Sequence, residues 1–337
     1  MGGDHAPDIV LNGANIARER FPQLDFLLFG PEPRIEQALR RLPKLAKVAT
    51  IHHTDEIVAA DAKPSQALRA GRKSSMRLAI DAVAEGKAAA MVSAGNTGAL
   101  MAMAKLALGT LPGIDRPAIA SVIPTQRSEC VMLDLGANIS CDVANLVQFA
   151  AMGDVFARTV LGRAEPTIGL LNIGAEEIKG REELRQAVAV LRQTPLAKQV
   201  HGFVEGTDIA AGTVDVVVTD GFTGNVALKT AEGTAQLMAF YLRQAIRHST
   251  LAKLGYLLVR PALRKFRSRI DPRRYNGAIF LGLNGIAVKS HGGTDALGFA
   301  NAIGVAVDMS VHGFLDKIRD ELALLYPRPD AAEAALG

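Results

Sequence analysis

Short, continuous apolar runs alternate with helical patterns along nearly all of this 337-residue chain, and no other feature constrains its fold as much. Helical patterns such as 76–85 and 182–193 separate the runs. Runs that are apolar throughout are typical of strands covered by helices on both faces. We therefore predict a three-layer α/β/α sandwich with a mostly parallel sheet. The seven predicted strands are 24–29, 48–52, 90–93, 118–123, 131–135, 168–173 and 214–218.

Three glycine-rich turns lead directly into helical patterns. The turn 220–225 follows the predicted strand 214–218, and the turn 93–98 follows the predicted strand 90–93. A third turn, 291–294, also precedes a helical stretch. Such turns present backbone N–H groups and a helix N-terminus above the strand ends, where an anion is favoured. The sequence therefore indicates an enzyme that handles phosphate or another anion.

The length and composition of the chain fit one large or two ordinary domains with a full core. We interpret residues 1–325 as a single catalytic domain and residues 326–337 as a flexible tail. No run approaches the ~18 apolar residues of a membrane span, and the first residues do not resemble a secretory signal. Two cysteines make no disulfide framework, so a reducing cytoplasm is the simplest location.

The segment 243–274, here called the basic arm, carries ten Lys or Arg residues and one acid, although the whole chain has a net charge of only +4. Leucines punctuate these cations and give an interrupted amphipathic pattern. We interpret the arm as a helical excursion from the main body rather than a separate domain. Such a pattern suits an anionic membrane surface, which we rank first. An acidic carrier protein ranks second, and a contact between subunits ranks third. The candidate contact residues are Leu254, Leu258, Arg264, Lys265, Arg267 and Arg269.

Several familiar catalytic motifs do not occur in the sequence. It contains no Gly-x-Gly-x-x-Gly, no Gly-x-x-x-x-Gly-Lys-Ser/Thr, no His-Glu-x-x-His and no Gly-x-Ser-x-Gly. The sequence therefore gives no support for a nicotinamide-binding fingerprint, the phosphate-binding loop of nucleoside triphosphatases, a zinc site or a hydrolase nucleophile. Cys130 and Cys141 have no histidine nearby in the sequence, and we interpret them as structural thiols. We expect neither a metal nor a cofactor.

Six segments, in this order and spacing, resemble the PlsX family, the phosphate acyltransferases of bacterial phospholipid synthesis. The resemblance extends from residue 1 to about residue 320 and implies a fold similar to that of phosphate acetyltransferases and isocitrate or isopropylmalate dehydrogenases. Family members usually carry a short strand before the first segment, so we expect a native start upstream of Met1. The segments are 1–7 (MGGDHAP), 92–101 (VSAGNTGALM), 133–138 (LDLGAN), 171–180 (LNIGAEEIKG), 220–229 (DGFTGNVALK) and 289–292 (KSHG).

The resemblance implies conversion of acyl-(acyl carrier protein) and orthophosphate into acyl phosphate and free carrier protein. It also implies a homodimer that contacts the inner face of the cell membrane peripherally. The chemistry is consistent with the missing triad, because phosphate is itself a nucleophile and a thiol with a pKa of about 8.5 is a good leaving group. Positioning and electrostatic stabilisation then supply most of the acceleration.

The matched motifs assign candidate catalytic roles to Lys179, Asn225 and His291. Lys179 would neutralise phosphate or the developing oxyanion, although without the motif it resembles an ordinary surface lysine. Asn225 would donate its amide to the carbonyl oxygen or to phosphate, or act only as a helix N-cap. His291 would bind phosphate or protonate the departing thiolate, or simply belong to a turn.

The other candidate residues would bind phosphate or substrate through their turns. For Asn96 and Asn138, helix capping competes evenly with a functional role. Asp220 would orient Lys179 or a helix N-terminus, or merely form a turn. The full set is Asn96, Thr97, Gly98, Asn138, Asp220, Gly224, Gly292 and Gly293.

Other classes of function remain as alternatives. An acyl-CoA:phosphate acyltransferase differs only in its donor. An NAD-dependent dehydrogenase of the isopropylmalate type would share the fold, but the isolated acids Asp134, Asp142 and Asp220 do not form the cluster that its divalent metal requires. A nucleic-acid-binding role is remote, because the basic arm offers only Tyr256 and Phe266 for stacking on bases.

Overall fold

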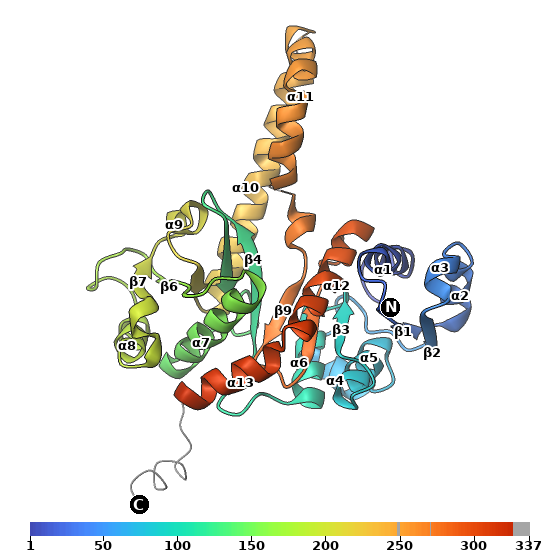
Figure 1. Cartoon of the computed structure of the whole chain (residues 1–337), viewed down its shortest axis with the longest axis horizontal. Coiled ribbons are helices and arrows are strands. Elements are labelled where there is room, and N and C mark those ends of the chain that lie inside the picture. The colour runs from blue at the N-terminus through green and yellow to red at the C-terminus, as the bar shows by residue number, and fades with distance from the viewer. Residues whose placement is uncertain (248–249, 270, 326–337) are drawn as a thin grey trace, which may run out of the picture.

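The structure, a computed structural model, describes residues 1–247, 250–269 and 271–325, so the predicted tail 326–337 lies outside the described residues. Strands and helices alternate along the chain (Figure 1). The strands are β1 (Phe26–Gly30), β2 (Ala49–His53), β3 (Ala90–Ser93), β4 (Ala118–Pro124), β5 (Glu129–Leu133), β6 (Ile168–Leu171), β7 (Val200–Val204), β8 (Val216–Val218), β9 (Ala278–Leu281) and β10 (Ile286–Lys289). The helices are α1 (Asp8–Arg20), α2 (Glu32–Leu39), α3 (Pro43–Ala46), α4 (Pro64–Ala70), α5 (Ser75–Ala84), α6 (Thr97–Leu108), α7 (Val143–Val160), α8 (Glu182–Leu191), α9 (Gly206–Ala211), α10 (Gly221–Arg247), α11 (Thr250–Arg269), α12 (Ala296–Val311) and α13 (Phe314–Leu325).

Eight strands form the main sheet in the order β3-β10-β9-β4-β5-β8-β6-β7, while β1 and β2 pair in parallel as a separate small sheet. The pairs β3–β10, β5–β8, β8–β6 and β6–β7 are parallel. The pairs β10–β9, β9–β4 and β4–β5 are antiparallel. The predicted mostly parallel sheet is thus confirmed, with an antiparallel block at its centre.

This antiparallel block reverses the direction of the strands across the sheet. Strands β3 and β10 end at one edge, here called the β10 edge. Strands β5, β8 and β6 end at the opposite edge, here called the β8 edge. The predicted glycine-rich turns do follow strand ends, but the reversal divides them between the two edges.

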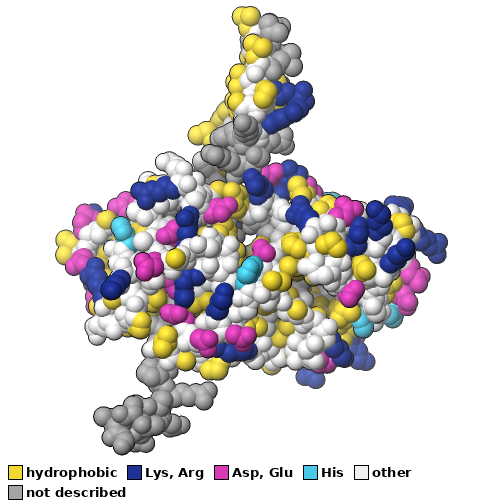
Figure 2. Space-filling model, in the orientation of Figure 1, with side chains coloured by type: hydrophobic (Ala, Val, Ile, Leu, Met, Phe, Trp, Pro, Cys, Tyr) yellow, Lys and Arg dark blue, Asp and Glu magenta, His cyan; other side chains and the backbone are white. Residues whose placement is uncertain are grey.

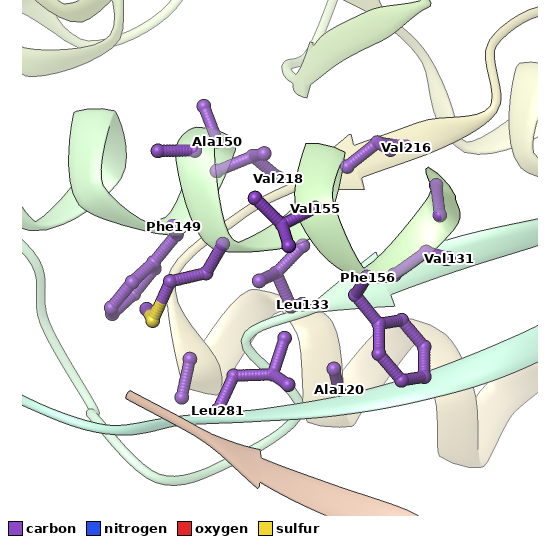
Figure 3. Packing of buried hydrophobic residues seen from close by; sticks show 14 of the residues in the cluster. Ala120, Val131, Leu133, Phe149, Ala150, Val155, Phe156, Val216, Val218 and Leu281 are labelled. Carbon is purple, nitrogen blue, oxygen red and sulfur yellow. The ribbon is translucent and has the colours of Figure 1, made fainter. Parts of the chain in front are cut away.

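Helices cover both faces of the main sheet, and successive residues of one strand enter different cores. In β5, Val131 and Leu133 pack with α7, whereas Met132 packs with residues of α6 on the other face. Figure 3 shows the first of these cores, in which Phe149 and Phe156 of α7 lie over the strands. A side chain buried this way gains roughly 1.5–3 kcal/mol, which explains the continuous apolar runs. The three-layer prediction is confirmed.

All seven predicted strands are present, and the structure adds β7, β9 and β10. Glycine or charged residues interrupt or flank these three strands, as do Gly202 in β7 and Lys289 in β10, so their apolar runs were not recognised. The predicted helical patterns 76–85 and 182–193 correspond to α5 and α8.

The basic arm lies in a helical hairpin that α10 and α11 form and that projects from the body (Figure 1). The predicted helical excursion is therefore confirmed. Among the described helices, none alone has both the length and the apolar composition of a membrane span. The pair α12 and α13 reaches them only together, with a bend of 59° between the two helices.

Candidate functional site

The structure places the predicted site residues in two groups, one at each edge of the main sheet. The turns after β3 and β10 share the β10 edge, whereas the turns after β5, β6 and β8 share the β8 edge. The first group holds Asn96, Thr97, Gly98, His291, Gly292 and Gly293, and the second holds Asn138, Lys179, Asp220, Gly224 and Asn225. Helix α10 starts at the β8 edge, directly after β8.

Asp220, at the end of β8, organises the start of α10. Its carboxylate is 2% exposed, accepts a hydrogen bond from the Thr223 backbone N–H (2.8 Å) and accepts another from the Thr223 hydroxyl (3.0 Å). It also pairs with the Arg181 guanidinium. Of the two orienting roles considered for Asp220, the structure shows the helix N-terminus and not Lys179. Arg181 directly follows the segment 171–180 and was not among the predicted site residues.

Asp134, named above only as an isolated acid, is a fully buried carboxylate at the end of β5. Oδ1 accepts hydrogen bonds from the backbone N–H groups of Ile119 (2.9 Å), Gly136 (3.2 Å) and Ala137 (3.0 Å). Oδ2 accepts from the backbone N–H (2.7 Å) and side-chain amide (2.9 Å) of Asn138. Burial raises the pKa of Asp134, and these hydrogen bonds oppose the rise. Asp134 thereby fixes the whole turn 134–138.

Asn138 is buried within this turn, and its amide nitrogen is already occupied. Besides Asp134, the amide donates to the Pro117 carbonyl oxygen at 2.9 Å. This geometry is that of a structural side chain, and phosphate binding by Asn138 remains an untested prediction.

Asn225 lies over the same turn, one helical turn into α10. Gly136 faces the Asn225 side chain, since a Cβ at Gly136 would lie 3.6 Å from the Asn225 Cβ. Gly224 packs directly on the backbone of Asp134, where any larger side chain would overlap the carbonyl oxygen. The close approach explains why glycine precedes Asn225, which remains exposed. Its exposed amide is available to donate to a bound substrate.

Lys179 is half-exposed in the loop after β6. Its ammonium group pairs with Glu176 at 2.8 Å, and this hydrogen bond raises the pKa of Lys179. The Asn172 amide donates to the Lys179 carbonyl oxygen at 3.1 Å and closes the loop. Lys179 is therefore a protonated cation next to the β8 edge, free to exchange a solvent-exposed partner for a ligand.

At the β10 edge, Asn96 caps α6. Its Oδ1 accepts from the Ala99 backbone N–H (2.9 Å), while its amide nitrogen donates to the carbonyl oxygens of Ala60 (2.8 Å) and Ala62 (2.9 Å). The first N–H groups of a helix have no partner inside the helix. Those of Thr97 and Gly98 occupy this position in α6.

His291 and the two glycines after it form a compact turn against the first residues of the chain. The Gly293 backbone N–H donates to His291 Nδ1 (3.1 Å), and the His291 backbone N–H donates to Asn276 Oδ1 (2.9 Å). The Asp4 backbone N–H donates to the Gly292 carbonyl oxygen at 3.0 Å. The His291 ring remains exposed at the surface of this turn.

Lys289 precedes this turn as the last residue of β10 and is a partly buried cation. Burial lowers its pKa to about 8. Asp4 raises this pKa and Lys229, on α10, lowers it, so both charges lie within electrostatic range. The sequence analysis quoted Lys289 within a motif but gave it no role.

The two edges together hold positive side chains, orphan backbone N–H groups and exposed amides, which is a set suited to an oxyanion or phosphate. Among the residues that the structure describes, no three His, Cys, Asp or Glu side chains lie together as a metal-binding set.

The predicted contact residues of the basic arm lie on α11, in the hairpin that projects from the body (Figure 1). Leu258 is 81% exposed and Arg264 is exposed as well. The side chains of Leu254, Lys265, Arg267 and Arg269 lie outside the described part of the structure. Figure 2 shows apolar side chains, along with Lys and Arg, at the surface of the hairpin.

Comparison with solved structures identifies the fold. A phosphotransacetylase from Streptococcus pyogenes superposes with a TM-score of 0.56 at 16% identity, covering 90% of this chain and 98% of that chain. The EutD phosphotransacetylase from Staphylococcus aureus gives a TM-score of 0.53 at 14% identity, covering 89% and 98%. At such identities the likeness concerns the fold alone.

Comparison of sequences identifies the family. A family model described as "Fatty acid synthesis protein" matches residues 1–317. The phosphate acyltransferase of Rhodospirillum centenum is 68% identical over 98% of this chain and 94% of its own length. That of Paramagnetospirillum magneticum is 60% identical over 97% and 93%. Six motifs in order, this fold and these identities agree: the chain belongs to the PlsX family of phosphate acyltransferases.

Proposed function

We propose that this protein transfers a fatty acyl group from acyl-(acyl carrier protein) to orthophosphate and so supplies acyl phosphate for phospholipid synthesis. The observation that carries the proposal is the identity of 55–68% to phosphate acyltransferases over nearly the whole chain. Eight such relatives share this range. The cationic, N–H-rich turns at the two sheet edges support the proposal. Phosphate is an anion when it binds, and the oxygen of the reacting carbonyl becomes negative during transfer.

The reaction needs no covalent enzyme intermediate. A phosphate oxygen attacks the thioester carbonyl carbon and forms the new C–O bond, and negative charge develops on the carbonyl oxygen. The C–S bond then breaks, and the thiolate leaves with its electron pair and takes up a proton. Lys179 and Asn225 share the β8 edge, so we assign both to the oxyanion, whereas the role of His291 at the opposite edge stays a prediction.

The first test is release of carrier-protein thiol from a long-chain acyl carrier protein, with and without orthophosphate. We expect release that saturates with phosphate and yields acyl phosphate. Thiol release that is independent of phosphate, from folded protein, would contradict the proposed function. Acyl-CoA serves as the second donor in the same assay, because equal kcat/KM for both donors would contradict a dedicated carrier-protein site.

The residue assignments have their own test. Lys179→Met should lower kcat by at least 10-fold while the melting temperature stays within a few degrees, because Lys179 is half-exposed and pairs only at the surface. Lys198→Met, at an exposed lysine of the short 3-10 helix Pro195–Gln199, serves as the matched control. Unchanged kcat in Lys179→Met would remove Lys179 from the mechanism.

We further propose a cytoplasmic homodimer that contacts anionic membrane peripherally through the α10–α11 hairpin. Its support is the number of large apolar side chains that the hairpin exposes, far more than a solvated helix pair needs. They are Leu237, Met238, Phe240, Tyr241, Leu242, Leu251, Leu258 and Val259. Both a second subunit and a lipid surface would cover such side chains, and the cations of the arm favour anionic lipid at its tip.

Co-sedimentation with vesicles of anionic phospholipid tests the membrane contact. Neutralising Arg264, Lys265, Arg267 and Arg269 together should abolish most vesicle binding with little effect on turnover in solution. The matched control neutralises four exposed cations of the α2–α3 region: Arg40, Arg41, Lys44 and Lys47. Equal vesicle binding by both quadruple variants would refute the membrane contact, and sedimentation equilibrium tests the dimer independently.

A further inference from the structure

A single ion pair joins the loop after β6, residues 172–181, to the start of α10. Arg181, the N-cap residue of α8, pairs through its guanidinium group with the carboxylate of Asp220. Within the described part of the chain, no other hydrogen bond or ion pair links this loop to the start of α10. The pair therefore connects the segment that carries Lys179 to the segment that carries Asn225.

The two partners of this pair differ in their surroundings. The side chain of Asp220 is 3% exposed and also accepts two hydrogen bonds from Thr223, so it has little freedom to move. The side chain of Arg181 is 55% exposed and contacts the carboxylate through one nitrogen, Nη2. Breaking a pair whose carboxylate is buried leaves that charge without a counter-ion, which costs far more than breaking a surface pair. The Arg181–Asp220 pair is therefore a firm bridge.

The backbone of Arg181 is anchored as well. Its carbonyl oxygen accepts a hydrogen bond from the Leu184 backbone N–H at 3.2 Å, in the first turn of α8. The Leu184 side chain is buried in the same core as the apolar residues of α7. Arg181 thus lies between a helix that is packed into the core and a carboxylate that is fixed at the end of β8, so its position is determined from both sides.

Lys179 lies two residues before this anchor, and its other contacts remain within the loop. Its ammonium group pairs with Glu176, and both side chains of that pair are about half-exposed. The Asn172 amide donates to the Lys179 carbonyl oxygen and closes the loop on itself. Neither contact reaches α10. The position of Lys179 relative to Asn225 therefore depends on the bridge that follows Lys179 in the chain.

We propose that Arg181 is a positioning residue for acyl transfer. By pairing with Asp220 it holds Lys179 in place relative to Asn225, and it does so without contacting the substrate. This inference rests on the proposed function, in which Lys179 and Asn225 stabilise the oxyanion. Because the oxyanion forms only during transfer, a disturbed arrangement of these two side chains lowers kcat and leaves substrate binding nearly unchanged.

Steady-state kinetics of Arg181→Met test the proposal. We expect kcat to fall roughly 10-fold, while the KM values for orthophosphate and acyl carrier protein change less than about 2-fold. Arg181→Lys should keep most of the wild-type kcat, because a single nitrogen makes the contact and lysine keeps the charge. Arg192→Met is the matched control and should behave as the wild type. Arg192 pairs with Glu177 of the same loop at 2.9 Å, but this pair is exposed and does not reach α10.

A double-mutant cycle shows whether Arg181 acts through Lys179. In a Lys179→Met background, Arg181→Met should lower kcat by less than about 2-fold, because the side chain that it positions is already missing. Losses that simply multiply would overturn the proposal. If Arg181→Met fails to fold because Asp220 is left unpaired, the double variant Arg181→Met/Asp220→Asn buries no charge and carries the same measurements.

The remaining outcomes separate this proposal from the proposed function. Wild-type kcat in folded Arg181→Met would overturn the positioning role, and phosphate-dependent thiol release by the wild type would still uphold the proposed function. A raised KM for orthophosphate with unchanged kcat would also overturn it, since Arg181 would then bind phosphate directly. Amide hydrogen exchange gives a readout without turnover: residues 172–180 should exchange faster in Arg181→Met and at the wild-type rate in Arg192→Met. Equal exchange in both variants would contradict the bridge.

Discussion

Replacing Asp134 by Asn tests the carboxylate that holds the turn after β5. The change is nearly isosteric, but it replaces one acceptor oxygen by an NH2 group. Oδ1 accepts three hydrogen bonds and Oδ2 accepts two. The amide nitrogen will therefore take the Oδ2 position, where it faces the two donors of Asn138; the other orientation would face three donors.

The expected loss of stability follows from those two donors. The Asn138 backbone N–H loses its acceptor in a buried place, which costs about 1–3 kcal/mol. The Asn138 side-chain amide keeps its bond to the Pro117 carbonyl oxygen and loses only one of two partners, at about 1 kcal/mol. Together, Asp134→Asn should lower the free energy of unfolding by about 2–4 kcal/mol.

Urea denaturation at fixed protein concentration, followed by circular dichroism, measures this loss. Asp25→Asn, at an exposed position before β1, is the control and should stay within about 0.5 kcal/mol of the wild type. A loss below about 1 kcal/mol for Asp134→Asn would refute the reasoning, because it would mean that the turn finds other acceptors at little cost.

Two further predictions concern α10 and the β10 edge. Gly224→Ala should destabilise the protein by at least about 2 kcal/mol, because its Cβ would overlap the backbone of the turn after β5. Gly233→Ala, in the same helix with nothing near its Cβ, should instead stabilise by up to about 1 kcal/mol, and equal effects in urea denaturation would contradict both estimates. The kcat/KM for orthophosphate should fall above about pH 8, because burial lowers the pKa of Lys289 at the β10 edge to about 8. Because the fold lowers the pKa of Lys289, its charged form is lost at a lower pH than that of an ordinary lysine. Lys289→Arg should remove this decrease in kcat/KM at high pH. A pH profile that this substitution leaves unchanged would exclude Lys289 as the cause of the decrease.

Much of the fold could be predicted from the sequence, because a strand that is buried on both faces is apolar at nearly every position. The run 214–218 is apolar at nearly every position since Val216 and Val218 enter one core and Val217 enters the other. The direction of each strand, by contrast, does not change its pattern of apolar residues. The antiparallel block formed by β9 and β4 was therefore not predicted, and neither was the division of the turns between two edges.

The candidate site was predictable only as a set of turns. The sequence showed that the segments 133–138 and 220–229 carry glycine next to polar residues, and the structure shows them packed on each other through Gly224. It did not show which polar side chain serves which purpose. Arg181 was missed because its partner Asp220 comes from another segment, and Asp134 was named only as an isolated acid although it holds its own turn. A partly buried Lys289 looks like any other lysine until its surroundings are known.

Helix α10 contains 27 residues, which corresponds to about 40 Å of continuous backbone hydrogen bonding. Its first turn rests on the Asp134 turn, and its far end forms half of the projecting hairpin (Figure 1). A helix of this kind transmits a tilt along its length as a rod does, because bending it sharply would break hydrogen bonds. Whatever holds the tip of the hairpin therefore also sets the angle at which Asn225 lies over the turn after β5.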